Sequence, residues 1–390
     1  MKRVSILGAT GSIGQSTVDL IRRHPERYDV VALTGGRNIA QLAKDAVALN
    51  ADVAVTAHDD LLDELRRALA GRDIEVAAGQ AALAEAATRP ADWIMSAIVG
   101  VAGLAPGLAA VERGGILALA NKESLVTAGP LLLRRAAEAG ATILPVDSEH
   151  SGIFQALRGE NPDEVERVII TASGGAFRDR PLSDLGHVTV TEASAHPNWD
   201  MGQRITIDSA SMFNKAMEII ETKEFFGFTP EQIEVLIHPE SIVHAVVGFR
   251  DGGLMAHMGA PDMRHAIGYA LNWPERRDLP VERLSLSRLG TLTFREADPV
   301  RYKALRLART VMDLGGLSGA VFNAAKERAL DHFLNGHIGF LEMSDLVEGT
   351  LDSILSGDGL IDAEITLETV GHADHVTREQ LDVMVRRRAG

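Results

Sequence analysis

Cysteine is absent from the 390-residue sequence. Its absence excludes disulfide frameworks, thiolate zinc sites, iron–sulfur clusters and every mechanism with a cysteine nucleophile. Positive charge is also scarce, because 39 Lys and Arg stand against 54 Asp and Glu, for a net charge of −15. This balance argues against general binding to nucleic acid or to an anionic membrane. An anionic substrate would therefore need local donors that overcome the field of the whole chain.

Long apolar runs are few. The uncharged stretch 93–111 is almost long enough to span a bilayer, but it contains three glycines and a proline. We interpret it as a buried strand, a glycine-rich loop and a short helix. The first apolar run is broken at Gly8 and Gly11, which leaves no room for a signal-peptide core. We therefore expect a soluble, cytoplasmic protein.

The first 147 residues alternate short apolar runs with amphipathic segments. Val4–Leu7, Val30–Leu33 and Ile116–Leu119 have the composition of buried strands, and Ile13–Arg23 has that of a helix. Such alternation is typical of parallel strands joined by crossover helices. The sequence thus predicts an α/β protein whose residues 1–147 form a doubly wound, Rossmann-like parallel sheet.

The pattern changes after residue 147. Between 148 and 275, apolar runs at 241–249 and 254–258 flank an Arg-Asp-Gly-Gly turn, which predicts a hairpin in an α+β domain. An edge strand there could pair with a second subunit. Residues 276–300 have the composition of a connector, and 301–390 that of a helical domain. In that domain, Thr377 and Gln380 form a capping-box pattern that predicts the start of a last helix.

A glycine-rich loop follows the first strand, with the sequence Gly8-Ala-Thr-Gly-Ser-Ile-Gly14. Glycines permit a tight turn there, and the N-terminus of the following helix offers amide groups to a pyrophosphate. The spacing departs from the usual G-x-G-x-x-G, and a loop without a ligand is the alternative. The strand–loop–helix setting favours dinucleotide binding.

The end of the second predicted strand bears on cofactor choice. An NAD site usually has an acidic residue there for the ribose hydroxyls, whereas this chain has Gly36-Arg-Asn38. The Arg37 guanidinium can pair with a 2′-phosphate, although it could equally be an ordinary surface residue. The missing acid and the present base favour NADPH.

Three carboxylates form a candidate metal site. Asp147 and Glu149 follow the predicted strand 142–146, and in extended chain they would project from one face. Glu218 comes from a predicted helix, roughly 211–225, with Asp208 or Ser209 as its N-cap. Without thiolates, an all-oxygen set suits hard cations such as Mg²⁺ or Mn²⁺. A solvated acidic turn and an exposed Lys215–Glu218 ion pair are the alternatives.

Two further segments carry polar groups. Ser173-Gly-Gly175 follows a predicted strand and could form an anion cradle. The segment 196–202 holds His196 and Trp199 among proline and glycine, and we interpret it as a lid that excludes water, with a core-packed tryptophan as the alternative.

Taken together, these motifs resemble the 1-deoxy-D-xylulose 5-phosphate reductoisomerase family. The match also includes Leu119-Ala-Asn-Lys-Glu-Ser124 and Met258-Gly-Ala-Pro-Asp-Met-Arg264, and the motifs occur in the family's order over residues 4 to 264. The resemblance implies conversion of 1-deoxy-D-xylulose 5-phosphate to 2-C-methyl-D-erythritol 4-phosphate in non-mevalonate isoprenoid biosynthesis. It also implies NADPH, a divalent cation (Mg²⁺, Mn²⁺ or Co²⁺) and a homodimer whose central domain carries catalysis and dimerisation.

Residue roles follow from the same resemblance. Asp147, Glu149 and Glu218 would bind the metal and, with Lys122 and His196, make up the catalytic set. Substrate would contact Lys122, Ser148, Glu149, Ser173, His196, Trp199, Ser209, Asn214, Lys215 and Glu218, with Ser173, Ser209, Asn214 and Lys215 at its phosphate. NADPH would contact Thr10, Gly11, Ser12, Ile13, Gly36, Arg37, Asn38, Asn121, Glu123 and Gly202.

Two other functions are compatible with parts of the sequence. Another NADP-dependent two-domain dehydrogenase would share the glycine loop, but it would not need three carboxylates beside a phosphate-binding helix. A non-catalytic NADP-binding sensor would have no need for the acidic residues, Lys122 or Trp199. An assay of turnover with and without a metal distinguishes the three functions. The reductoisomerase requires the metal, the other dehydrogenase does not, and the sensor shows no turnover.

Overall fold

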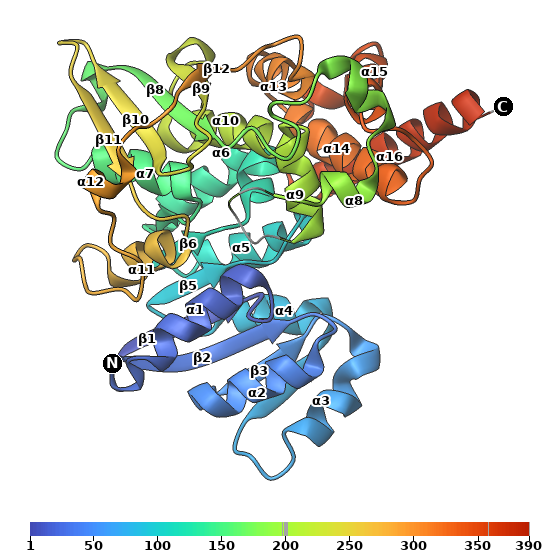
Figure 1. Cartoon of the computed structure of the whole chain (residues 1–390). Coiled ribbons are helices and arrows are strands. Elements are labelled where there is room, and N and C mark those ends of the chain that lie inside the picture. Colours follow the sequence, from blue (N-terminus) through green and yellow to red (C-terminus); the bar gives the residue numbers. More distant parts are fainter. Residues whose placement is uncertain (197, 199–201, 358, 390) are drawn as a thin grey trace. The chain divides into compact units, whose positions relative to one another are not determined.

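The computed structural model describes residues 1–196, 198, 202–357 and 359–389. The chain forms two compact units (Figure 1). The first unit contains residues 1–124, 132–151 and 262–282, and the second contains 125–131, 152–261 and 283–390. The finer division of the chain at residues 147, 275 and 300 stays a prediction.

The first unit is built on a seven-stranded parallel sheet in the order β4-β3-β2-β1-β5-β6-β7. Its strands are β1 (Lys2–Leu7), β2 (Tyr28–Gly35), β3 (Val53–Thr56), β4 (Glu75–Ala78), β5 (Trp93–Ser96), β6 (Ile116–Leu119) and β7 (Thr142–Pro145). The chain starts at the centre, runs to one edge and returns to pair β5 with β1. The α/β class and the parallel sheet predicted from the sequence are confirmed.

Helices connect these strands. They are α1 (Ser12–Arg22), α2 (Ile39–Leu49), α3 (Leu62–Ala68), α4 (Gly79–Thr88), α5 (Leu104–Val111) and α6 (Lys122–Ala139), and α7 (Ser148–Ala156) follows β7. The strands are apolar on both faces, so that Val4, Ile6 and Leu7 of β1 are fully buried. The uncharged stretch 93–111 forms β5, a loop and α5, as predicted.

A late segment of the chain completes the first unit. The helix α11 (Arg264–Asn272) follows the second unit's sheet in sequence, yet it packs against α1. The indole N–H of Trp93 donates to the carbonyl of Ala270 at 3.0 Å, and the Lys2 ammonium donates to the carbonyl of Leu271 at 2.8 Å. This return of the chain was not predicted from the sequence.

The second unit contains a five-stranded mixed sheet in the order β11-β10-β8-β9-β12. Its strands are β8 (Val165–Ala172), β9 (Ile233–Ile237), β10 (Val243–Phe249), β11 (Leu254–Met258) and β12 (Arg295–Glu296). β10 and β11 form the predicted antiparallel hairpin, and β11 is an edge strand. Only β8 and β9 pair in parallel among the described strands of this sheet.

Helices make up the rest of the second unit. They are α8 (Val190–Ala193), α9 (Gln203–Ala210), α10 (Phe213–Phe226), α12 (Leu286–Leu289), α13 (Lys303–Leu314), α14 (Ser318–Leu334), α15 (Glu342–Leu355) and α16 (Leu367–Ala389). The capping-box prediction at Thr377 is wrong, because that residue is fully buried inside the continuous helix α16.

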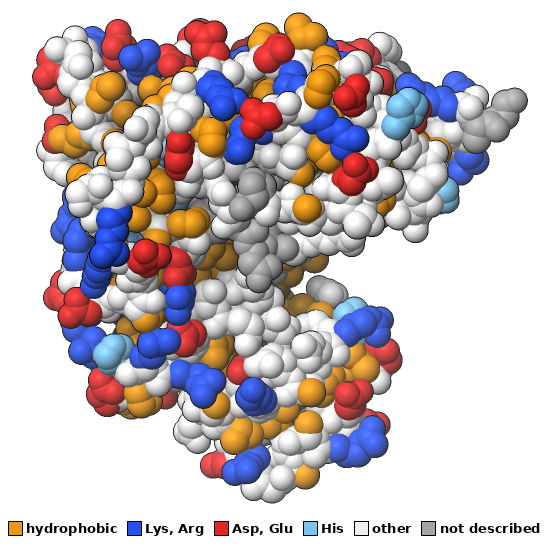
Figure 2. Space-filling view, viewed as in Figure 1, with side chains coloured by type: hydrophobic (Ala, Val, Ile, Leu, Met, Phe, Trp, Pro, Cys, Tyr) orange, Lys and Arg blue, Asp and Glu red, His pale blue; other side chains and the backbone are white. Residues whose placement is uncertain are grey.

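One face of the molecule carries charges of both signs. Figure 2 shows acidic and basic side chains interspersed over the visible face. On that face the acidic side chains do not gather into one patch. Among the described residues, none of the helices combines the length and the apolar character needed to cross a membrane.

Candidate active site

The glycine loop after β1 has no room for side chains at two of its positions. Gly8 has φ of +89°, and a Cβ there would lie 2.5 Å from the carbonyl oxygen of Ala97. A Cβ on Gly14 would lie 2.2 Å from the carbonyl oxygen of Gly8. The Gly8 N–H donates to Thr34 Oγ1 at 3.0 Å, which ties the loop to β2. The loop and the first turn of α1 hold the predicted cofactor residues 10–13, in a setting suited to a pyrophosphate.

The segment between β2 and α2 holds the next predicted cofactor residues. Asn38 caps α2, because its side chain accepts a hydrogen bond from the Gln41 N–H at 3.1 Å. The side chain of Arg37 is 68% exposed, and its Nη1 lies 3.4 Å from Asp60 Oδ2. The guanidinium is accessible to a 2′-phosphate, which would compete with the Asp60 carboxylate for it.

Asn121 and Glu123 lie where β6 leads into α6. The buried Asn121 side chain accepts from the Ser124 N–H at 3.0 Å and donates to the carbonyl of Ile98 at 2.7 Å. It also donates to Glu123 Oε2 at 2.8 Å. Asn121 therefore fixes the loop that follows β5, a structural role that the sequence did not reveal.

A cluster of charged groups lies at the end of β7. The Lys122 ammonium is 2.7 Å from Asp147 Oδ2, and both side chains are largely buried. The Ser148 hydroxyl donates to Glu149 Oε2 at 2.6 Å. The extended chain that we predicted for Asp147 and Glu149 is wrong, because α7 begins at Ser148 and Glu149 lies in its first turn. Asp147 and Glu149 offer only carboxylate oxygens as metal ligands, which are the ligand atoms that hard cations prefer.

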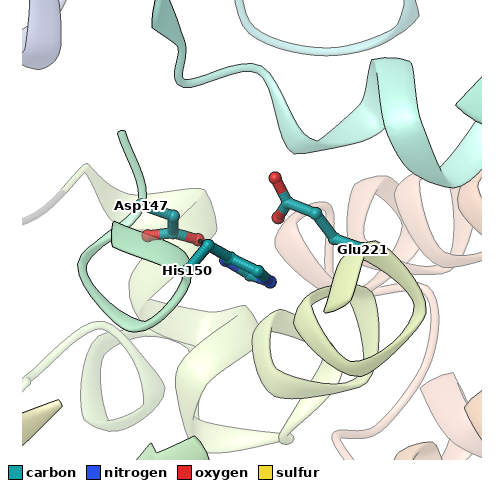
Figure 3. Close-up of side chains that lie close together, drawn as sticks. All are labelled: Asp147, His150 and Glu221. Atoms are coloured by element: carbon teal, nitrogen blue, oxygen red, sulfur yellow. Dashed lines mark ion pairs between the residues drawn. The ribbon is translucent and has the colours of Figure 1, made fainter. Parts of the chain in front are cut away.

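His150 lies in the same cluster, and it was not among the site residues predicted from the sequence. Its imidazole is fully buried, and Nδ1 lies 3.9 Å from Asp147 Oδ2. Figure 3 shows Asp147 and His150 at the beginning of α7. The spacing of three residues places both side chains on one face of a helix turn, and it was the available signal.

Glu218 is the third predicted metal ligand, on α10 of the second unit. It is 1% exposed, forms an ion pair with Lys215, and accepts from the Asn214 side-chain amide at 2.5 Å. Lys215 is buried as well, so the alternative of an exposed ion pair is wrong. Glu221, one turn further along α10 (Figure 3), is also buried and was not recognised in the sequence. Its signal was the spacing of three residues from Glu218.

The predicted N-cap at Asp208 or Ser209 is wrong. Both residues lie in the last turn of α9, and Met212, with φ of 65°, separates α9 from α10. A left-handed residue interrupts the helix, so Ser211 does not share a helical face with Asn214 and Lys215.

The structure brings two predicted phosphate-binding segments together. Gly175 has φ of +68°, and a Cβ there would lie 2.5 Å from Ala210 Cα and 2.8 Å from the carbonyl oxygen of Ser209. The loop that begins at Ser173 therefore packs directly on the end of α9. Its backbone is held further by Arg178, whose guanidinium donates to the Ser173 carbonyl at 2.7 Å.

His196 lies beside the same loop. Its Nε2 is 2.9 Å from Ser173 Oγ, and its Nδ1 accepts from the Asn198 N–H at 3.1 Å. Nδ1 is thus the unprotonated nitrogen, and Nε2–H donates to the serine. Burial, reinforced by the charge of Arg178, lowers the pKa of His196 to about 4. Gly202 is the N-cap of α9, whereas Trp199 lies outside the described residues.

The pKa of His196 predicts a dependence of stability on pH. Between its ordinary value of 6.5 and about 4, the unfolded chain binds a proton at this residue and the folded chain does not. The free energy of unfolding should therefore fall as the pH drops through this window. Urea unfolding across the window should show a shallower pH dependence for His196→Asn, whereas the exposed-site variant His187→Asn should follow the wild type. Identical slopes for all three proteins would contradict this assignment.

Comparisons with known proteins cover almost the whole chain. Three family models match. The model described as 1-deoxy-D-xylulose 5-phosphate reductoisomerase matches residues 4–129, and the model of that enzyme's C-terminal domain matches residues 143–226. A third model, described as DXP reductoisomerase C-terminal domain, matches residues 258–380. A protein of that name from Ruegeria sp. (strain TM1040) is 68% identical over 390 residues, covering 100% of this chain and 99% of the relative.

Solved structures agree. The enzyme of that name from Zymomonas mobilis, in complex with NADPH, is 45% identical, with a TM-score of 0.92 and coverage of 98% of both chains. A DOX-P reductoisomerase in complex with NADPH, fosmidomycin and magnesium is 38% identical, with a TM-score of 0.93 over 99% of this chain and 98% of the other.

Proposed function

Because the chain belongs to the 1-deoxy-D-xylulose 5-phosphate reductoisomerase family, we propose that it converts this phosphate to 2-C-methyl-D-erythritol 4-phosphate with NADPH and a divalent cation. One observation carries the proposal: the family models match segments from residue 4 to residue 380, and the relatives match along the full chain. The reaction is a step of non-mevalonate isoprenoid biosynthesis.

The first unit supplies the proposed NADPH site. Solved relatives bind NADPH, and this chain has a glycine loop at the end of its central strand and an accessible Arg37. The proposed contacts are Thr10, Gly11, Ser12, Ile13, Gly36, Arg37, Asn38, Asn121, Glu123 and Gly202. NADPH, when bound, supplies the hydride that converts the rearranged aldehyde into an alcohol.

Cofactor preference can be tested at Arg37. Replacing Arg37 with Glu removes a charged hydrogen-bond donor, so the KM for NADPH should rise by about 10-fold or more while the KM for NADH changes little. Arg66 is a matched control, because it is also exposed and paired with an aspartate. Steady-state kinetics with both cofactors would measure the effect, and unchanged cofactor preference in Arg37→Glu would refute the role of Arg37.

Asp147, Glu149 and Glu218 are the proposed metal ligands. All three offer carboxylate oxygens, a donor set that fits Mg²⁺ and also Mn²⁺ or Co²⁺, and solved relatives contain magnesium. Lys122 and Lys215 balance part of the acidic charge within each unit. The cation, when bound, supplies Lewis acidity to the ketone and hydroxyl oxygens of the substrate.

The remaining proposed residues orient the substrate. Lys122 would supply positive charge to the oxyanion that develops as the carbon–carbon bond is broken and remade. Ser148 and His196 contact the reacting half, and the neutral His196 is set up to donate from Nε2. Ser173, Ser209, Asn214 and Lys215 bind the phosphate, and the packing of Gly175 on the end of α9 supports the grouping of the two serines. Trp199 is proposed to close over the substrate.

A nicotinamide absorbance assay tests the proposal directly. Protein, NADPH, 1-deoxy-D-xylulose 5-phosphate and Mn²⁺ or Mg²⁺ should give a substrate-dependent loss of absorbance that a chelator abolishes. A loss with another keto substrate and no metal requirement would instead favour a different NADP-dependent dehydrogenase. No loss at all, with NADPH still bound, would favour the sensor.

We further propose a cytoplasmic homodimer that uses Mn²⁺ or Mg²⁺. The edge strand β11 supports the dimer, because Leu254 and Met255 are 59% and 42% exposed on it. An exposed apolar edge strand is a template for pairing with another chain, and a second copy would cover it.

A further inference from the structure

Two ionic contacts join α9 to α14 within the second unit. Both helices are labelled in Figure 1. The Lys326 ammonium lies 2.9 Å from Asp208 Oδ2, and the two side chains are only 7% and 10% exposed. On the outer side, Arg204 contacts Asp331 at 2.7 Å, with both side chains substantially accessible to solvent. The inner pair is therefore buried, and the outer pair is a surface contact.

Asp208 occupies a demanding position. It immediately precedes Ser209, a proposed phosphate ligand, in the last turn of α9. A buried carboxylate so close to a bound phosphate would repel it, since charges interact strongly where water is excluded. A buried carboxylate is also costly without a partner. Lys326 supplies the compensating charge from α14, 118 residues further along the chain.

We propose that Lys326 is a positioning residue for the phosphate of the substrate, because it neutralises Asp208 and holds the end of α9 against α14. The proposal rests on the proposed function, which places the phosphate at Ser209. The helical C-terminal part of the chain thereby takes part in substrate recognition through Asp208. Lys326 does not touch the reacting atoms, so its removal affects substrate binding more than the chemical step.

Three variants test the proposal. Lys326→Met leaves the Asp208 charge uncompensated, so the KM for 1-deoxy-D-xylulose 5-phosphate should rise by about 10-fold, with kcat and the KM for NADPH close to wild type. The double variant Lys326→Met with Asp208→Asn removes both charges and should restore the KM. Arg204→Met breaks only the outer contact and should leave the KM unchanged.

The opposite outcomes overturn the proposal. An unchanged KM in Lys326→Met, or a double variant as impaired as the single one, would show that the Lys326–Asp208 pair has only a structural role. Circular dichroism checks folding, and if Lys326→Met does not fold, Lys326→Gln is measured in its place with the same expectation.

A binding measurement separates this proposal from the proposed function. Inorganic phosphate, titrated into the protein and followed by ³¹P NMR, should bind more weakly to Lys326→Met than to the wild type or the double variant. If the wild type does not turn over 1-deoxy-D-xylulose 5-phosphate, the proposed function fails, and this titration alone decides the role of Lys326. Equal phosphate affinity in all three proteins would refute it.

Discussion

Glu218→Gln is expected to lower kcat by at least about 100-fold and to weaken Mg²⁺ binding in parallel, because it removes a charged ligand from the proposed metal site. The substitution keeps the size of the side chain and a hydrogen-bonding group for Asn214. Activity over a range of Mg²⁺ concentrations would measure both effects.

The control for this variant lies on the same helix. Glu224 is a carboxylate of α10 that pairs with Lys223 at 3.0 Å and has no proposed role at the metal. Glu224→Gln should retain activity close to the wild type. Glu218→Gln also removes the carboxylate partner of the buried Lys215, which can destabilise the fold. The melting temperatures of the variant and the wild type should therefore be compared, and activity should be measured at a temperature well below both. Full activity in Glu218→Gln would remove this residue from the ligand set.

Gly14→Ala is expected to destabilise the folded protein by about 1–3 kcal/mol, because the new methyl group collides with backbone that cannot easily move. Its Cβ would lie 2.2 Å from the Gly8 carbonyl oxygen and 2.5 Å from that of Ala9. The same displacement distorts the loop proposed to hold the pyrophosphate, so NADPH affinity should fall as well. Urea unfolding and fluorescence titration with NADPH would measure the two effects.

Gly11→Ala separates steric strain from cofactor contact. Its Cβ would lie 3.5 Å from the Gly8 carbonyl oxygen, an ordinary contact distance, and the unfolding midpoint should stay near the wild type. Any loss of NADPH affinity in Gly11→Ala would then report on close approach of the cofactor itself. Equal unfolding midpoints for Gly14→Ala and the wild type would show that the loop accommodates a side chain at residue 14.

The sequence predicted the features that depend on local pattern. The alternation of apolar runs predicted the parallel sheet, because each buried strand and each crossover helix has its own periodicity. The glycine loop was recognisable because its constraint is short-range: Gly8 and Gly14 are six residues apart and meet in one turn. The hairpin β10–β11 was predicted for the same reason, from its turn residues.

Local pattern failed where the fold imposed another conformation. Thr377 and Gln380 have the spacing of a capping box, yet packing of α16 against α14 keeps the helix continuous through them. At Asp208, apolar and polar periodicity gave no sign that Met212 takes a left-handed conformation and divides the helix in two. In both cases tertiary contacts decide the backbone.

Individual pairwise contacts between distant residues could not be predicted from local pattern. Nothing near Asp208 in the sequence indicates that its partner is Lys326. The resemblance grouped Ser173 with Ser209 at the phosphate, but it did not indicate the direct packing of Gly175 on the end of α9. Composition alone also left exposure open as the alternative on α10, whereas Lys215 and Glu218 are both buried. The chemical character of the candidate site was thus readable from sequence, and its environment was not.

The return of α11 to the first unit has a consequence for biosynthesis. Trp93 and Lys2 find their backbone acceptors only at residues 270 and 271, so a nascent chain released from the ribosome as far as residue 147 has all seven parallel strands but lacks these partners. The first unit consequently reaches its final packing only after most of the second sheet has been synthesised. The first unit therefore starts to fold before the second during translation, but it cannot complete its packing until residues 262–282 have been synthesised.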